Sequence, residues 1–274
     1  MAPMCTRLAA LLAAAAAGPA TASPAQAEPA KVGVFFWHDS PNDVATLAGV
    51  QLGLERAGVP HAFVVQRADS DPERARAALA ALHAAGCDAV LALGTQAALL
   101  AKEHVRDAPV VFAAVTNPVT AGVVPDWTGS GAALCGASNW IDPAAVLEVF
   151  RLAVPTLARL GMLRCRTSGV VSAAELAGMR AFLDTPDAPA VELVESVADD
   201  EADLPRATAR LLAAEVDAIW IPIDIGVYRN VPAVERAVGE AGVPLLSTAA
   251  AGVRGGALVG AAVDYRLHGQ RAAA

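Results

Sequence analysis

The amino-acid sequence predicts an α/β protein of two lobes, each a doubly wound parallel sheet, joined by a hinge. The first observation is a regular alternation of short apolar runs with helical stretches of about ten to fifteen residues, which is typical of parallel βαβ units. The second is the length of 274 residues, which suits two lobes of ordinary size better than a single core. The third is that neighbouring apolar runs end in small polar residues, as strands do at the ligand-binding edge of an open α/β sheet.

The first lobe is predicted to contain four strands separated by three helices. The apolar run Val32–Phe36 predicts the first strand, and apolar residues at helical spacing predict a helix over Asp43–Arg56. The segment Ser70–Glu73 combines a capping residue with an early proline, which indicates the start of another helix. The remaining elements are expected as a strand at 61–65, a helix from 70 to about 86, a strand at 88–93, a helix at 95–105 and a strand at 109–115.

A second series of the same kind predicts the second lobe. Its strands are expected at 159–164, 190–196, 217–223 and 243–247, and its helices at 142–155, 172–183, 204–215 and 231–241. The glycine-rich segment Trp127–Gly136 is interpreted as a crossover between the lobes, and Gly255–Val259 with Val263–Tyr265 as a return to the first lobe. The predicted lobes are therefore 28–136 plus 254–274, and 137–253.

The first 27 residues have the three-part order of a secretory signal peptide. Arg7 is the only charge before the apolar run Leu8–Ala17, which is too short to span a bilayer. Small-x-small sites follow, and cleavage after Ala25-Gln26-Ala27 would leave Glu28 as the first mature residue. The alternative is an ordinary alanine-rich helix. The sequence thus predicts a secreted, periplasmic protein.

Composition and motifs argue against several classes of function. The formal net charge is −8, and an acidic chain without a basic stripe is a poor nucleic-acid binder. Cysteine and histidine spacing matches no metal site, and the chain has no Walker A motif, dinucleotide fingerprint or nucleophile elbow. We therefore expect no nucleic-acid partner, no cofactor, no metal and no enzymatic activity.

Two neighbouring strands of the first lobe end in candidate binding residues. The strand at 88–93 is followed by Gly94-Thr95 and at once by a helix, so backbone N–H groups and the Thr95 hydroxyl can bind an anion such as a carboxylate. The next strand is followed by Thr116 and Asn117, which offer neutral donors and acceptors. The alternatives are a helix cap at Thr95 and a turn at Thr116 and Asn117.

Two further pairs in the first lobe and the crossover are candidate ligand contacts. Trp37 and His38 follow the first strand, and the indole face could stack on a ring or a cation. A partly buried loop anchor is the alternative for Trp37, and a lone loop histidine such as His38 more often has no special role. Ser138 and Asn139 lie where the predicted hinge and cleft meet.

The second lobe contributes Asp224 and Tyr228. Asp224 ends an apolar strand, and its carboxylate could form a charge-assisted bond with a ligand ammonium. The alternative is an N-cap of the following helix. Tyr228 could close over the ligand with its ring. If Thr95 binds a carboxylate and Asp224 an ammonium, the ligand is zwitterionic.

Short motifs follow one another in a fixed order through most of the mature chain. They are Lys31-Val32-Gly33-Val34, Gly94-Thr95, Thr116-Asn117-Pro118 with Ala121-Gly122-Val123-Val124, Ile221-Pro222-Ile223-Asp224, and Val263-Asp264-Tyr265 with Gly269. Together they resemble the ABC transporter substrate-binding proteins, specifically the tryptophan/tyrosine-type branch with the type I periplasmic binding protein fold. Asn117 departs from the aspartate commoner in that family, which removes a negative charge.

The resemblance implies a solute-binding protein that captures a small molecule between two lobes and delivers it to the permease of an ABC importer. The ligand it suggests is an aromatic amino acid or another small carboxylate. A sensory binding protein of the same fold, signalling to a membrane partner, remains an alternative, as does a cryptic enzyme on the same scaffold. Relatives continue beyond the position of Ala274, so Tyr265–Ala274 is expected to be a short helix on the first lobe with Leu267 and three alanines as its apolar contacts.

Overall fold

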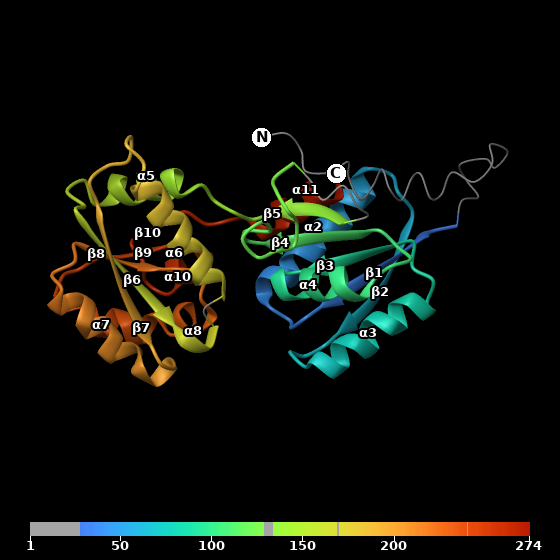
Figure 1. Cartoon of the computed structure of the whole chain (residues 1–274), viewed down its shortest axis with the longest axis horizontal. Coiled ribbons are helices and arrows are strands. Elements are labelled where there is room, and N and C mark those ends of the chain that lie inside the picture. The colour runs from blue at the N-terminus through green and yellow to red at the C-terminus, as the bar shows by residue number, and fades with distance from the viewer. Residues whose placement is uncertain (1–27, 129–133, 169, 240) are drawn as a thin grey trace. The chain divides into compact units, whose positions relative to one another are not determined.

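A computed structural model of the chain describes residues 28–128, 134–168, 170–239 and 241–274 (Figure 1). The predicted signal peptide lies outside these described residues. Contacts divide the chain into two compact units: the first runs to Trp140 and resumes at Asp264, and the second is Ile141–Val263. The two lobe boundaries, predicted at 136 and 254, thus lie closer to the C-terminus than the sequence suggested.

The first lobe is built on a five-stranded parallel sheet. Its strands are β1 (Ala30–Phe36), β2 (His61–Arg67), β3 (Ala89–Leu93), β4 (Val110–Val115) and β5 (Leu134–Ser138), in the order β2-β1-β3-β4-β5. The first four confirm the prediction. The interpretation of residues up to Gly136 as a crossover was wrong, because β5 pairs with β4. This strand lacks the β-branched and aromatic residues that mark strands in a sequence.

Helices cover both faces of the first sheet, as Figure 1 shows. They are α2 (Pro41–Arg56), α3 (Pro72–Ala84), α4 (Thr95–His104) and α11 (Tyr265–Ala273). Because side chains alternate along a strand, Phe36 packs on the α2 and α11 side while Phe35 and Phe112 pack with Leu79 and Leu82 of α3. The doubly wound prediction is confirmed for this lobe.

The last helix, α11, packs on α2 through glycines. A Cβ added to Gly49 would lie 2.0 Å from the backbone oxygen of Arg266, and one added to Gly269 would lie 2.0 Å from that of Thr46. The two backbones are therefore in direct contact. Leu267, expected to supply apolar contact, is 46% exposed, so the expectation for this side chain was wrong.

The second lobe repeats the topology of the first. Its parallel sheet has the order β10-β9-β8-β6-β7, formed by β6 (Arg159–Cys165), β7 (Glu192–Ala198), β8 (Ala218–Ile221), β9 (Leu245–Ser247) and β10 (Val259–Gly260). Counted from its own first strand, each sheet reads 2-1-3-4-5. The segment ending at Val259 was predicted to return to the first lobe, but Val259 pairs with Leu246 of β9.

Helices also lie on both faces of the second sheet. They are α5 (Pro143–Ala153), α6 (Val170–Leu183), α7 (Leu204–Ala213), α8 (Ile225–Tyr228), α9 (Val231–Val238) and α10 (Ala250–Arg254). Met162 and Trp220 pack with α5 and α6, whereas Leu163 and Ile221 pack with α7 and α9. None of the helices in the described part of the chain is both long and apolar enough to cross a membrane.

This topology defines where a binding site can form in each lobe. Ligands of open α/β sheets bind at the carboxyl ends of the strands, at the point where the strand order reverses. In the first lobe that switch point lies between β1 and β3, and in the second between β6 and β8.

Gly49→Ala should destabilise the first lobe, because the new methyl group would collide with the backbone of α11. Overpacking of this kind costs about 1–3 kcal/mol of unfolding free energy. Urea denaturation followed by circular dichroism measures the change. Gly239→Ala, at the end of α9, is the matched control, since its nearest neighbour to the added Cβ is 3.3 Å away. Equal stability of the two variants would contradict the proposed α2–α11 contact.

Candidate functional site

The candidate residues of the first lobe come together at the carboxyl edge of its sheet. They follow or end four strands that are neighbours in the order β1-β3-β4-β5. Because parallel strands end at the same edge, the sheet gathers them on one side. They are Trp37 and His38 after β1, Gly94 and Thr95 after β3, Thr116 and Asn117 after β4, and Ser138 and Asn139 at the end of β5.

The start of α4 has no side-chain cap among the described residues. Gly94 is the N-cap, with a φ of 88° that disfavours other residues. Thr95 is the first helical residue, so the interpretation of Thr95 as the cap was wrong. The first N–H groups of a helix have no partner within the helix and carry its positive dipole end, which favours a carboxylate.

Asp43 lies beside this helix start and was not singled out from the sequence. Its Oδ2 accepts a hydrogen bond of 2.6 Å from the Ser40 hydroxyl, and its Oδ1 lies 3.5 Å from the position of a Cβ on Gly94. Burial raises the pKa of Asp43, although the bond from Ser40 opposes the shift. A raised pKa lowers the cost of binding an anion nearby, because the carboxyl can take up a proton. The capping pattern Ser40-x-x-Asp43 was the available sequence signal.

Asn139 carries a buried acceptor that has no partner among the described residues. The residue is 4% exposed, and its Nδ2 donates a hydrogen bond of 3.0 Å to the Tyr265 hydroxyl of α11. Its Oδ1 is buried and has no hydrogen-bond partner among the residues that the structure describes. A buried polar group left unpaired costs about 1–3 kcal/mol. Within the described residues this oxygen is therefore a candidate acceptor for a bound solute.

His268 of α11 holds the strand ends in place. β4 has an irregular register between Phe112 and Val115, and Ala114 there has a φ of 58°. The Ala114 N–H donates to Nε2 of His268 over 3.1 Å, and the ring also bonds to the backbone of Ala137 in β5. Burial lowers the pKa of His268 to about 4, so the ring is neutral at pH 7. The last helix therefore fixes the ends of β4 and β5.

Several candidate ligand contacts already have partners within the first lobe. The Ser138 hydroxyl donates to the backbone oxygens of Val115 and Thr116 over 3.0 and 2.9 Å, and Asn117 Oδ1 accepts from the Thr120 N–H over 3.0 Å. These bonds support the turn interpretation of Asn117. Trp37 is half-buried against the core, as a loop anchor would be, while His38 is exposed and Thr116 is buried.

Asp224 is positioned differently from the expectation of a carboxylate presented to a ligand. The residue is fully buried, and its Oδ2 accepts hydrogen bonds from the Cys165 N–H at 3.0 Å and the Ser172 hydroxyl at 2.9 Å. It thus links β8 to β6 across the switch point of the second lobe. Its side chain does not cap α8. Tyr228 is half-buried and packs on the core of this lobe.

Glu175 of α6 is a second buried carboxyl in this lobe. Its Oε2 accepts a hydrogen bond of 2.7 Å from the Ile223 N–H, and it also bonds to the Thr248 side chain. Burial, with a smaller contribution from Asp224, raises the pKa of Glu175 to about 7. The sequence signal was its position as the single acidic residue of an apolar helix.

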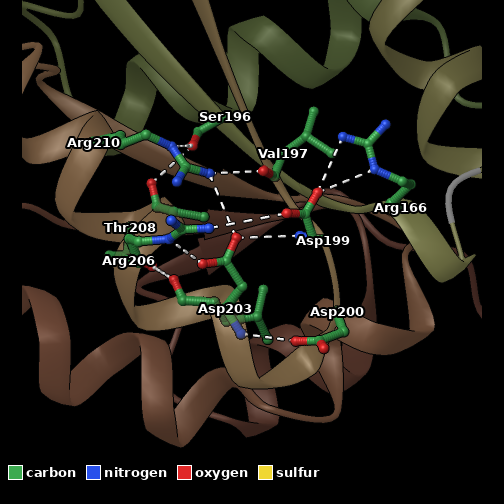
Figure 2. A network of polar contacts seen from close by, with 11 residues as sticks. Arg166, Ser196, Val197, Asp199, Asp200, Asp203, Arg206, Thr208 and Arg210 are labelled. Carbon is green, nitrogen blue, oxygen red and sulfur yellow. Dashed lines mark hydrogen bonds and ion pairs between the residues drawn. The ribbon is translucent and has the colours of Figure 1, made fainter.

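The end of β7 carries an ion-pair network on the surface of the second lobe (Figure 2). Arg166 pairs with Asp199 at 3.1 Å, and Arg206 Nε donates to Asp203 over 2.5 Å. The bond from Arg206 lowers the pKa of Asp203. Exposed pairs contribute little stability.

No metal centre is evident in the described part of the chain. None of its histidine, cysteine, aspartate and glutamate side chains form a group of three that could hold an ion.

Residues 31–274 match the family model of the ABC transporter substrate binding proteins. The chain belongs to this family. Its two parallel-sheet lobes have the type I periplasmic binding protein-like fold. The family is a class of solute-binding proteins and not a class of enzymes.

Relatives of known name or structure agree with this assignment. The chain is 25% identical over 185 residues to a tyrosine-binding protein of Clostridioides difficile. The aligned region covers 68% of this chain and 52% of that protein. The chain thus spans about half the length of this curated relative. An ABC domain from Streptococcus pneumonia in complex with L-Trp is 22% identical, with a TM-score of 0.73 over 90% of this chain and 83% of that one. A ligand-free, open substrate-binding protein from Clostridium difficile is 21% identical, with a TM-score of 0.72 over 89% and 82%.

Acid should destabilise the first lobe through His268. Its pKa falls from 6.5 to about 4 on folding, so the stability it gives is complete above pH 6.5 and is lost as the pH falls toward 4. The loss of unfolding free energy amounts to about 3 kcal/mol. The raised pKa of Glu175 changes the stability with pH in the opposite direction. The informative quantity is therefore the difference in unfolding free energy between wild type and His268→Gln, measured by urea unfolding from pH 7 to 4.5. The exposed His83→Gln is the control. Parallel pH profiles of wild type and His268→Gln would refute this role.

Proposed function

We propose that this protein binds a small zwitterionic solute, of the aromatic amino acid class, and delivers it to the permease of an ABC importer. The observation that carries this proposal is the buried Oδ1 of Asn139, which has no partner among the described residues. It lies at the same sheet edge as the start of α4, where the described residues place no side-chain cap. An amino acid supplies what both lack: an N–H donor for the acceptor and a carboxylate for the helix.

The first lobe then binds the main-chain groups of the solute. The N–H groups at the start of α4 and the Thr95 hydroxyl bind the carboxylate. Asn139 Oδ1 accepts a hydrogen bond from the ammonium, a charge-assisted bond that is shorter and stronger than a neutral one. Asp224 is not assigned to the ammonium in this proposal, because the residue is fully buried and its Oδ2 is bonded to Cys165 and Ser172.

The relatives support the choice of aromatic amino acids as first probes. One is named for tyrosine and another was solved with L-Trp. Family membership supports an ABC transporter as the partner. Export through the predicted signal peptide would place the protein where such a partner receives solute.

L-tyrosine or L-tryptophan should raise the melting temperature of the mature protein. A solute at a hundredfold its dissociation constant adds about 2.7 kcal/mol to the unfolding free energy. Differential scanning fluorimetry across the amino acids and small carboxylates measures the shift in melting temperature. If none of these compounds stabilises the protein, the proposed function is wrong.

Asn139→Ala should weaken binding of the stabilising amino acid by about 1.5–3 kcal/mol, the range for a hydrogen bond to a charged group. Thr95→Val should weaken it less, since the backbone donors of α4 remain. Gln51→Ala, which removes an exposed carboxamide from α2, is the control. Titration calorimetry measures each affinity. An unchanged affinity in a folded Asn139→Ala variant would remove the central contact of the proposal.

A further inference from the structure

Two helices begin at the switch point of the first lobe, one on each face of its sheet. α2 follows β1 and α4 follows β3, and these two strands are neighbours in the sheet. Leu54 of α2 belongs to the core on one face, whereas Ala98 of α4 belongs to the core on the other. Both helix starts therefore lie at the position where open α/β sheets bind their ligands.

The carboxyl group of Asp43, in the first turn of α2, faces the start of α4. The three heavy atoms nearest to a Cβ placed on Gly94 are Oδ1, Oδ2 and Cγ of Asp43, at 3.5, 3.8 and 3.9 Å. Both residues belong to the first lobe. Asp43 thus brings a carboxyl group to the helix start that the proposed function assigns to the carboxylate of the solute.

The local structure of α2 uses only part of this carboxyl group. In a capping box, the acid of the first turn accepts a hydrogen bond from the backbone N–H of the N-cap. Here the Ser40 N–H donates to the His38 oxygen over 3.0 Å, and Asp43 Oδ2 accepts from the Ser40 hydroxyl over 2.6 Å. This bond fixes the carboxyl group and leaves Oδ1, the oxygen nearer to Gly94, for a solute.

Burial makes the charge of Asp43 sensitive to what binds beside it. The residue is 6% exposed. His38 and Asp39, which follow β1, act on it electrostatically with opposite effects, and burial is the larger cause of its raised pKa. A buried charge without a compensating partner is costly. A cation carried by the solute would therefore gain more here than at an exposed position, and a second anion would lose more.

We propose that Asp43 selects solutes by their charge: its carboxylate attracts the ammonium group of a zwitterion and repels a solute that brings only a carboxylate to α4. This inference rests on the proposed function, because it places the solute carboxylate at the start of α4. Attraction of the right ligand and repulsion of the wrong one both contribute to specificity. Asp43 is thus a specificity-determining residue of the first lobe.

Asp43 and Asn139 make different demands on a solute. Asn139 Oδ1 loses a hydrogen bond when the ammonium group is absent, which lowers affinity without repelling the solute. Asp43 adds a Coulomb interaction whose sign follows the charge of the solute. An acid without an ammonium group must bind beside this charge, or Asp43 must first take up a proton, and either route lowers its affinity. Removing the charge of Asp43 should therefore improve the binding of such an acid, whereas removing the Asn139 side chain should not.

Titration calorimetry at neutral pH with L-tryptophan and with indolepropionate, the same molecule without its ammonium group, tests the proposal. Asp43→Asn should bind indolepropionate about tenfold more tightly than the wild type does, and L-tryptophan about tenfold more weakly. Asn139→Ala should gain no affinity for indolepropionate. Asp107→Asn, the same change at an exposed position beyond the C-terminal end of α4, should keep both wild-type affinities.

A folded Asp43→Asn variant that gains no affinity for indolepropionate would overturn the proposal, as would an equal gain in Asn139→Ala or Asp107→Asn. If Asp43→Asn does not fold, Asp43→Ser removes the same charge with a smaller side chain and is judged by the same outcome. Absence of binding of both compounds to the wild type and to the variants would count against the proposed function as well. The other contrary results would leave the binding of L-tryptophan intact.

Discussion

The requirement that buried polar groups be paired governs both carboxyl edges of this protein. All ten strands described are parallel within their sheets, so each lobe gathers its strand ends on one side. Most polar groups there find partners in the same lobe: Asp43 with Ser40, Ser138 with the backbone after β4, and Asp224 with β6 and α6. Asn139 Oδ1 is the exception in the described chain. The proposed solute site would give this atom its partner.

The first lobe depends on a helix from the far end of the sequence. Contact between glycines lets α11 approach α2 closely enough for Tyr265 and His268 to reach the ends of β4 and β5. His268 supplies the acceptor that the irregular backbone at Ala114 requires. The second lobe uses α6 in a similar way, but with a titratable carboxyl at the centre. The carboxyl edges of the two lobes thus contain groups whose contributions to stability respond oppositely to acid.

The sequence predicted the sheets better than the site. Apolar runs such as Val32–Phe36 and regular helix spacing are local signals, and they located the first four strands of the first lobe. β5 and β10 were not predicted. β5 lacks the residues typical of strands, and β10 is only two residues long. The strand ends could be predicted as candidate site positions, but the hydrogen-bond partners of the side chains there could not. Asn139 bonds to a residue 126 positions away, and Asp224 to one 59 positions away. Such contacts between sequence-distant residues determine whether a polar side chain is available to a solute or is hydrogen-bonded within its own lobe.

A crystal structure of the mature protein with L-tryptophan bound is the most direct test of the central claim. We expect a ligand nitrogen about 2.7–3.2 Å from Asn139 Oδ1, with the ligand carboxylate at the first N–H groups of α4. A ligand at another surface would contradict the claim, as would Asn139 Oδ1 bonded to a group of the protein itself while the ligand nitrogen lies elsewhere.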